Sequence, residues 1–184
     1  MKALVIFADG FEEIEAISAV DILRRAGVDV LCAGLDGEVV KGAHGALVKT
    51  DATFGDINAG EFSAVVLPGG MPGASNLANS AQVGEILRNF NEQGKLIAAI
   101  CAAPMALAAH GVLSEKWTCY PGFEGRVRED KSGFTGSQKV VKCGNVITSR
   151  GPATAMEFAL AVARELCGEK IYRKLRDELL IDLA

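Results

Sequence analysis

The chain has 184 residues, of which 49% are hydrophobic and 23% charged, and its net charge is −4 at pH 7. This length and composition predict one globular domain, residues 1–184, with a sizeable core. The scattered Lys and Arg residues argue against a dedicated nucleic-acid surface, and the absence of a long apolar segment argues against a membrane span.

The N-terminal elements predict a βαβ unit. Residues 2–7 (KALVIF) have the continuous apolar centre of a buried strand, and residues 28–33 form a second strand. Between them, residues 12–26 predict an amphipathic helix that opens with acidic residues, closes with arginines and is followed by Gly27. A strand, a helix and a strand at this spacing favour a parallel sheet.

The middle of the chain repeats this alternation. Residues 62–67 predict a buried strand that ends at Pro-Gly-Gly (residues 68–70), and residues 76–93 predict one helix. Residues 96–100 predict the next strand, followed directly by a helix over residues 102–109. These elements would extend the same parallel sheet.

The other predicted elements are two hairpins and two C-terminal helices. They are the hairpin of residues 38–40 and 46–48, the hairpin of residues 139–143 and 146–149, and the helices 153–166 and 170–180. The whole pattern predicts a doubly wound α/β fold, a mostly parallel sheet with helices on both faces.

Cys101 lies at the junction between a predicted strand and a predicted helix. Such a turn needs small residues two positions to either side, and Ala99 and Ala103 supply them, as in a nucleophile elbow with Cys in place of Ser. The helix N-terminus is expected to lower the pKa of the thiol. The alternative interpretation is an inert cysteine packed in the core.

The five cysteines contain no CxxC pair, which argues against a disulfide framework or a cysteine zinc site and favours a reducing cytoplasm. The first residues do not resemble a signal peptide. Cys32, Cys143 and Cys167 are expected to pack, whereas Cys119, beside Tyr120 in a loop, is expected to be a second accessible thiol.

Backbone amides and a carboxylate could assist Cys101. The N–H of Gly70 and the N–H of Ala102 would form an oxyanion hole, although Pro-Gly-Gly could equally be only a tight turn. Glu15 lies near the inward face of its helix, where burial would raise its pKa and allow it to share a proton with a thiolate. Glu12 and Glu13 are interpreted as surface residues that complement the helix dipole.

The chain has two histidines, His44 and His110. His110 is interpreted as a helix-end residue, and His44 lies in a predicted hairpin without catalytic context. A Cys-His hydrolytic pair therefore lacks an evident base.

Four motifs in one order carry a family resemblance: ADGFEEIE (8–15), LPGG (67–70), AAICAAP (98–104) and TSRGPAT (148–154). The chain resembles the ThiJ/PfpI superfamily, a class I glutamine amidotransferase-like group, and within it the branch of the parkinsonism-associated protein deglycase and its bacterial relatives. The resemblance implies a flavodoxin-like sandwich, a homodimer and an oxidation-prone cysteine at the elbow.

The resemblance also implies roles for single residues. Cys101 matches the nucleophile, and Glu15 matches the glutamate whose protonated carboxyl hydrogen-bonds the cysteine sulfur. Gly70 and Ala102 match the amides of the oxyanion site. Ala102 stands where protease-like and chaperone-like branches carry histidine, which argues against a peptidase.

Further positions are carried over only as candidates. Arg25 and His44 match positions that lie toward the dimer interface in relatives, and Gly151 belongs to the TSRGPAT motif. Tyr120 stands where the human member has a loop histidine, so proton transfer assigned to that histidine would fall to Tyr120, Glu15 or water.

The function that the resemblance implies is a cytoplasmic, glutathione-independent glyoxalase or protein deglycase. It would act on methylglyoxal-type 1,2-dicarbonyls, or on glycated thiols and amines, through a hemithioacetal of Cys101, with no metal or organic cofactor. The alternative is a chaperone-like, redox-sensing protein of oxidative-stress protection that oxidises Cys101 without turnover. A cysteine hydrolase is the third and weakest interpretation.

Overall fold

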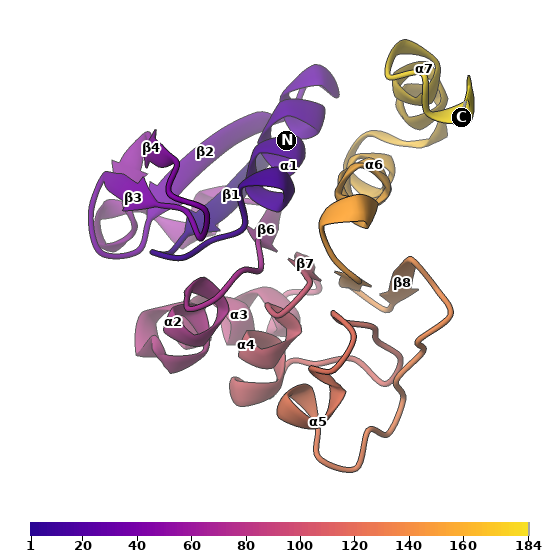
Figure 1. Cartoon of the computed structure of the whole chain (residues 1–184). Coiled ribbons are helices and arrows are strands. Elements are labelled where there is room, and N and C mark those ends of the chain that lie inside the picture. Colours follow the sequence, from indigo (N-terminus) through magenta and orange to yellow (C-terminus); the bar gives the residue numbers. More distant parts are fainter. Residues whose placement is uncertain (184) are drawn as a thin grey trace.

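The computed structural model describes residues 1–183 and consists of β-strands flanked by helices (Figure 1). The strands are β1 (Lys2–Phe7), β2 (Asp29–Gly34), β3 (Val39–Lys41), β4 (Leu47–Lys49), β5 (Ala52–Thr53), β6 (Ala64–Leu67), β7 (Leu96–Ile100), β8 (Val140–Cys143) and β9 (Val146–Ser149). The α-helices are α1 (Glu13–Arg25), α2 (Gly73–Asn79), α3 (Ala81–Glu92), α4 (Pro104–Ala109), α5 (Glu124–Val127), α6 (Ala155–Cys167) and α7 (Glu169–Glu178). Short 3₁₀ helices lie at Phe54–Asp56, Ala59–Glu61, Pro152–Thr154 and Ile181–Leu183.

Seven strands form the main sheet in the order β5-β2-β1-β6-β7-β9-β8. Its strands pair in parallel except for β8, which runs antiparallel to β9. The central order β2-β1-β6-β7-β9 is that of a flavodoxin-like doubly wound sheet, so the predicted fold class is confirmed. Both predicted hairpins are also confirmed, since β3 pairs antiparallel with β4 and β8 with β9.

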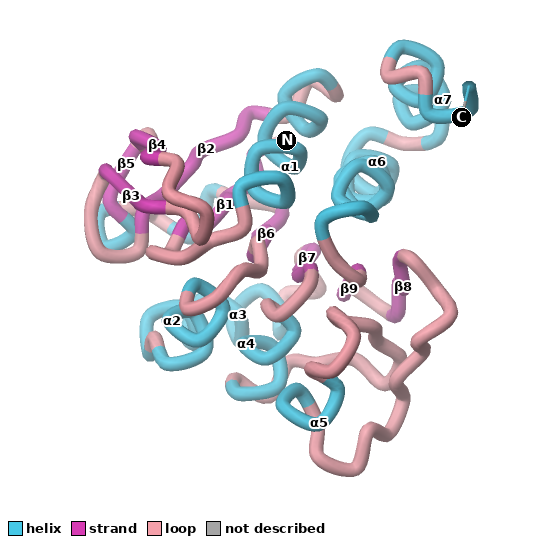
Figure 2. Tube along the Cα trace, in the orientation of Figure 1, coloured by secondary structure: helices cyan, strands magenta, loops and turns pink. Residues whose placement is uncertain are grey.

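Side chains of β1 show how one strand serves two cores. Ala3, Val5 and Phe7 belong to the apolar cluster under α1 and α6, whereas Leu4 and Ile6 belong to the cluster under α2, α3 and α4. Alternate residues of a strand point to opposite faces, and a central parallel strand is therefore apolar throughout. Figure 2 shows the two helical layers on either side of the strands.

The predicted single helix over residues 76–93 is wrong. Ser80 has an extended backbone (φ −81°, ψ 114°) that ends α2, and its hydroxyl accepts a hydrogen bond from the N–H of Val83 at 3.3 Å. A serine at an N-cap stabilises a new helix start, so two shorter helices replace one. The predicted helix over residues 102–109 likewise begins later, at Pro104, and β5 and α5 were not predicted.

Candidate active site

Cys101 follows β7 in a backbone conformation that side chains rarely adopt. Its φ is +65°, in the left-handed region, which costs roughly 1–2 kcal/mol for a residue other than glycine. Its N–H donates to the carbonyl of Ser149 at 3.0 Å, and its carbonyl accepts from the N–H of Tyr120 at 2.9 Å. Ala99 and Ala103 are fully buried beside it. Tertiary contacts therefore hold the residue in a strained turn.

Glu15 lies on the buried face of α1 and has no exposed surface. Its Oε2 accepts a hydrogen bond from the N–H of Gly69 at 2.8 Å. Its Oε1 has no hydrogen-bond partner among residues 1–183. A buried carboxyl with one unpaired oxygen is costly in its charged form, which favours the protonated state.

The acidities of the two groups depend on each other. Burial raises the pKa of the Glu15 carboxyl to about 7, although the Gly69 amide acts to lower it. Burial raises the pKa of the Cys101 thiol to about 12, and the negative charge of Glu15 adds to this rise. The pair is therefore coupled, and a proton that moves from the sulfur to Glu15 removes the charge that opposes thiolate formation.

The predicted lowering of the Cys101 pKa by a helix N-terminus is wrong. The amides of Gly70 and Ala102 do lower the pKa of the thiol, but burial outweighs them. Helix α4 begins only at Pro104 and has six residues, so few aligned peptide dipoles contribute at the sulfur.

Two glycines let the loop after β6 approach the thiol. A Cβ added to Gly69 would lie 2.5 Å from the Cβ of Cys101 and 2.8 Å from Oε2 of Glu15. Gly70 has φ +88°, and a Cβ there would lie 2.4 Å from the N atom of Glu12. The sequence Gly-Gly is thus required by close packing on the site, and the tight-turn interpretation alone does not explain it.

A cavity of about 450 Å³ opens above Cys101. Its lining includes Cys101, Ala102 and Gly70, together with Tyr120 and His44. Five residues predicted for the site thus line one cavity. The cavity volume suits a small molecule.

Two candidate residues complete the surroundings. Gly151 lies under the ring of Tyr120: a Cβ there would be 2.9 Å from Cδ2 of Tyr120 and 4.0 Å from Oε1 of Glu15. Tyr120 is 43% exposed at the cavity wall. Arg25 is not in the cavity lining, and it pairs instead with Asp21 at 2.7 Å near the far end of α1.

The prediction of a second accessible thiol is wrong. Cys119 has no exposed surface, because Trp117, Val127 and other apolar side chains of the same cluster cover it. Burial raises the pKa of the Cys119 thiol to about 12. Its Sγ donates to the carbonyl of Tyr120 at 3.4 Å.

The interpretation of Glu12 and Glu13 as simple surface charges is also wrong. Glu12 is 8% exposed and lines the cavity, and the side chain of Glu13 is 18% exposed against the β3–β4 hairpin. No local pattern predicts this burial, because the hairpin that covers the two residues contributes His44, some thirty residues further along the chain. Only the folded chain brings these groups together.

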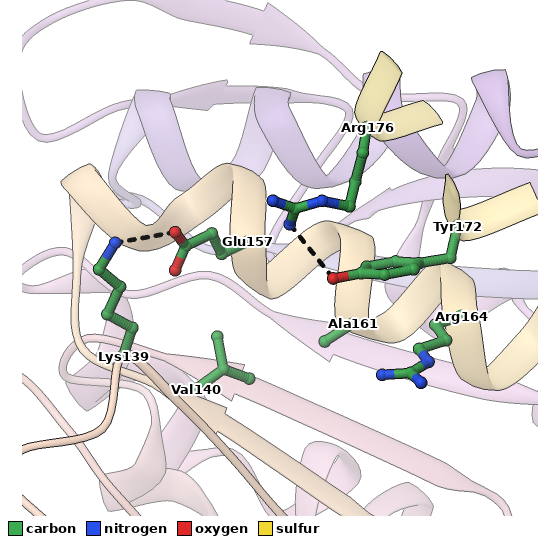
Figure 3. A pocket seen from close by; sticks show the side chains of 7 residues that line it. All are labelled: Lys139, Val140, Glu157, Ala161, Arg164, Tyr172 and Arg176. Carbon is green, nitrogen blue, oxygen red and sulfur yellow. Dashed lines mark hydrogen bonds and ion pairs between the residues drawn. The ribbon is translucent and has the colours of Figure 1, made fainter. Parts of the chain in front are cut away.

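A second cavity of about 470 Å³ lies between β8, α6 and α7, on the helical layer away from α4 (Figure 3). Lys139 pairs there with Glu157 at 2.8 Å, and Arg176 donates to the hydroxyl of Tyr172 at 3.2 Å. No cysteine lines it. The candidate for covalent chemistry is therefore the cavity at Cys101.

Comparisons with known proteins agree with these observations. Residues 1–165 match the model of the DJ-1/PfpI family. The chain is 46% identical over 182 residues to protein dj-1beta of Drosophila melanogaster, covering 98% of this chain and 97% of that protein. The crystal structure of Drosophila melanogaster DJ-1beta superposes with a TM-score of 0.92 and covers 97% of both chains.

A second relative has an enzymatic name. The chain is 41% identical over 157 residues to glutathione-independent glyoxalase DJR-1.2 of Caenorhabditis elegans, covering 85% of this chain and 83% of that protein. The family resemblance predicted from the four sequence motifs is thus confirmed. Separately, none of the helices within residues 1–183 has the length and apolar character needed to cross a bilayer.

Proposed function

The chain belongs to the DJ-1/PfpI family, and we propose that it is a glutathione-independent glyoxalase that converts methylglyoxal-type 1,2-dicarbonyls into 2-hydroxy acids. The observation that carries the proposal is the Cys101–Glu15 pair: a strained thiol that lines a small cavity, and a buried carboxyl with a pKa of about 7 whose charge acts on that thiol. The glyoxalase name of the worm relative supports the same reaction class.

The proposed reaction begins when the Cys101 thiol adds to the aldehyde carbon and forms a hemithioacetal. Its proton passes to Glu15, and the N–H groups of Gly70 and Ala102 stabilise the oxyanion that develops. Glu15 is suited to accept and return protons because its pKa lies near neutral pH.

In the next steps the hemithioacetal rearranges to a thioester, and the product is then released. A proton leaves the former aldehyde carbon and is added to the neighbouring carbon through an enediol, which oxidises the first carbon and reduces the second. Water then cleaves the resulting thioester and regenerates the thiol. The sum is methylglyoxal plus water giving lactate and a proton, and it needs no external oxidant or reductant.

The test is conversion of methylglyoxal to lactate by the purified chain without glutathione. We expect many turnovers for the wild type, none for Cys101→Ser, and a fall in kcat of at least a hundredfold for Glu15→Gln. Glycated thiols and amines, the deglycase substrates, are assayed in parallel. A wild type that shows no turnover, but gains two oxygens on Cys101 in mild peroxide, would refute the proposal in favour of a redox-responsive thiol protein.

The same family membership leads us to propose a homodimer. Exposed apolar side chains on two adjacent helices support it: Ile14 (56% exposed) and Ile17 (46%) on α1, and Met156 (42%) on α6. Large apolar side chains that gather on neighbouring helices are typical of an interface between copies. Light scattering after gel filtration measures the mass directly.

A further inference from the structure

Two carboxylates converge on one imidazole at the edge of the Cys101 cavity. The Nδ1 atom of His44 lies 3.0 Å from Oε2 of Glu13 and 3.4 Å from Oε2 of Glu12. One ligand atom from each of the three side chains lies within 4.8 Å of the other two. Glu12 and Glu13 come from the start of α1, and His44 comes from the β3–β4 hairpin.

The hydrogen bonds available to the two carboxylates are unequal. Oε1 of Glu13 accepts from the N–H groups of His44 (2.8 Å) and Ala46 (3.3 Å), which fixes this carboxylate against the hairpin. Nδ1 carries at most one hydrogen, and it is shared between two acceptors. Glu12 is 8% exposed, and within residues 1–183 the charged partner of its carboxylate is the Nδ1 of His44 at 3.4 Å.

At the second cavity, the positive and negative charges are matched. Lys139 has its own carboxylate partner in Glu157, and Arg164 and Arg176 pair with Glu169 and Asp182 (Figure 3 shows the lining side chains). Each cation there is matched by one anion. At His44 two carboxylates share one ring that carries at most a single positive charge, so the negative charge there exceeds what the ring can balance.

We propose that Glu12, Glu13 and His44 form a binding site for a divalent transition-metal ion of the Zn²⁺ class. An ion with two positive charges would neutralise both carboxylates, which one proton on His44 cannot do. Two carboxylate oxygens and an imidazole nitrogen are ligands that Zn²⁺ accepts, with a fourth position left for water.

The distances fit such an ion. Tetrahedral coordination with bonds of about 2.0–2.1 Å places neighbouring ligand atoms about 3.3–3.4 Å apart. The separations of 3.0 and 3.4 Å from Nδ1 lie close to this value. The glycine at position 42 permits this arrangement. A Cβ there would lie 2.3 Å from Oε1 of Glu13 and would displace that carboxylate.

The proposed metal site lies at the edge of the Cys101 cavity. Glu12 and His44 both line the space above Cys101, so the ion would stand at its edge. The reaction proposed for Cys101 does not use the ion. Binding can therefore be measured independently of turnover, and failure of one proposal leaves the other standing.

The test is isothermal titration of the full chain with Zn²⁺ at pH 7.5. We expect one ion per chain for the wild type, and affinity reduced at least tenfold in both His44→Ala and Glu12→Gln. The ring of His44 is 73% exposed, so its removal leaves the core untouched. Both variants keep all five cysteines, so a site that they lose is not a thiolate site.

Lys49→Ala on the same hairpin is the matched control, because Lys49 is exposed and supplies no ligand atom. It should bind Zn²⁺ as the wild type does. Zn²⁺ should also shift the imidazole NMR signals of His44 and not those of His110. The proposal is overturned if the wild type binds no ion, or if His44→Ala binds it as tightly as the wild type.

Discussion

Replacing Glu15 by Gln is expected to stabilise the fold at neutral and alkaline pH. The folded-state pKa of Glu15 is about 7, against 4.5 for an ordinary glutamate. Because it is raised, the protonated carboxyl favours the folded state fully below pH 4.5, and this contribution is lost as the pH rises to 7. Glutamine keeps the acceptor for the Gly69 amide and has no charge to bury.

The magnitude follows from the same two values. The difference between 4.5 and about 7, at 1.36 kcal/mol per pH unit, amounts to about 3 kcal/mol. The wild type should therefore lose about 3 kcal/mol of unfolding free energy between pH 4 and pH 8 through this residue, and Glu15→Gln should not. Any fixed cost of placing an amide beside the unpaired Oε1 position is the same at both pH values and cancels in the comparison.

The assay is urea denaturation of both proteins at pH 4, 6 and 8 and at one protein concentration, since a dimer would make stability depend on concentration. Glu92→Gln, which removes an exposed carboxylate on α3, controls for the change in net charge. The reasoning about Glu15 fails if the variant and the wild type keep the same difference in unfolding free energy at all three pH values. It also fails if the difference shrinks as the pH rises.

Three further outcomes follow from the site and the surface. Gly70→Ala should lower the unfolding free energy by more than about 2 kcal/mol, because the new Cβ meets the backbone at Glu12 and φ is +88°; an unchanged urea midpoint would contradict this. Native alkylation with iodoacetamide, mapped by mass spectrometry, should leave Cys119 unmodified, since it has no exposed surface; rapid labelling there would show that the loop opens. Ile17→Asp should convert the proposed dimer to a monomer in light scattering, and an unchanged mass would place the interface elsewhere.

The fold was predictable where a local signal and the tertiary structure agree. Continuous apolar runs located the central strands, and Gly27 marked the end of α1 through its φ of +83° and a hydrogen bond to the carbonyl of Arg24 at 3.0 Å. The break at Ser80 was missed because apolar periodicity continues across it, while a single hydroxyl decides where the next helix begins. The two-residue strand β5 has no periodicity to detect, since it exists only by pairing with β2.

The site was predictable to the extent that its residues sit in short motifs. The elbow motif located Cys101, and Pro-Gly-Gly located the loop that approaches it. The motifs could not predict burial. Burial decides that the pKa of the Cys101 thiol is raised and not lowered, and it excludes solvent from Cys119. Nor could they place His44 beside Glu13, because that contact depends on how the hairpin folds back onto α1.

Two energetically unfavourable features, a strained backbone and a buried carboxyl, occur together at the Cys101 junction. Cys101 in the left-handed region and a buried Glu15 each reduce stability. A Cβ on Gly69 would clash with both side chains, so a glycine is needed at this position for the loop to pack against them. The apolar clusters on both faces of the sheet offset the cost elsewhere. A substitution that stabilises this junction, as Glu15→Gln should, is therefore expected to remove the proton transfer that we propose for Cys101 and Glu15.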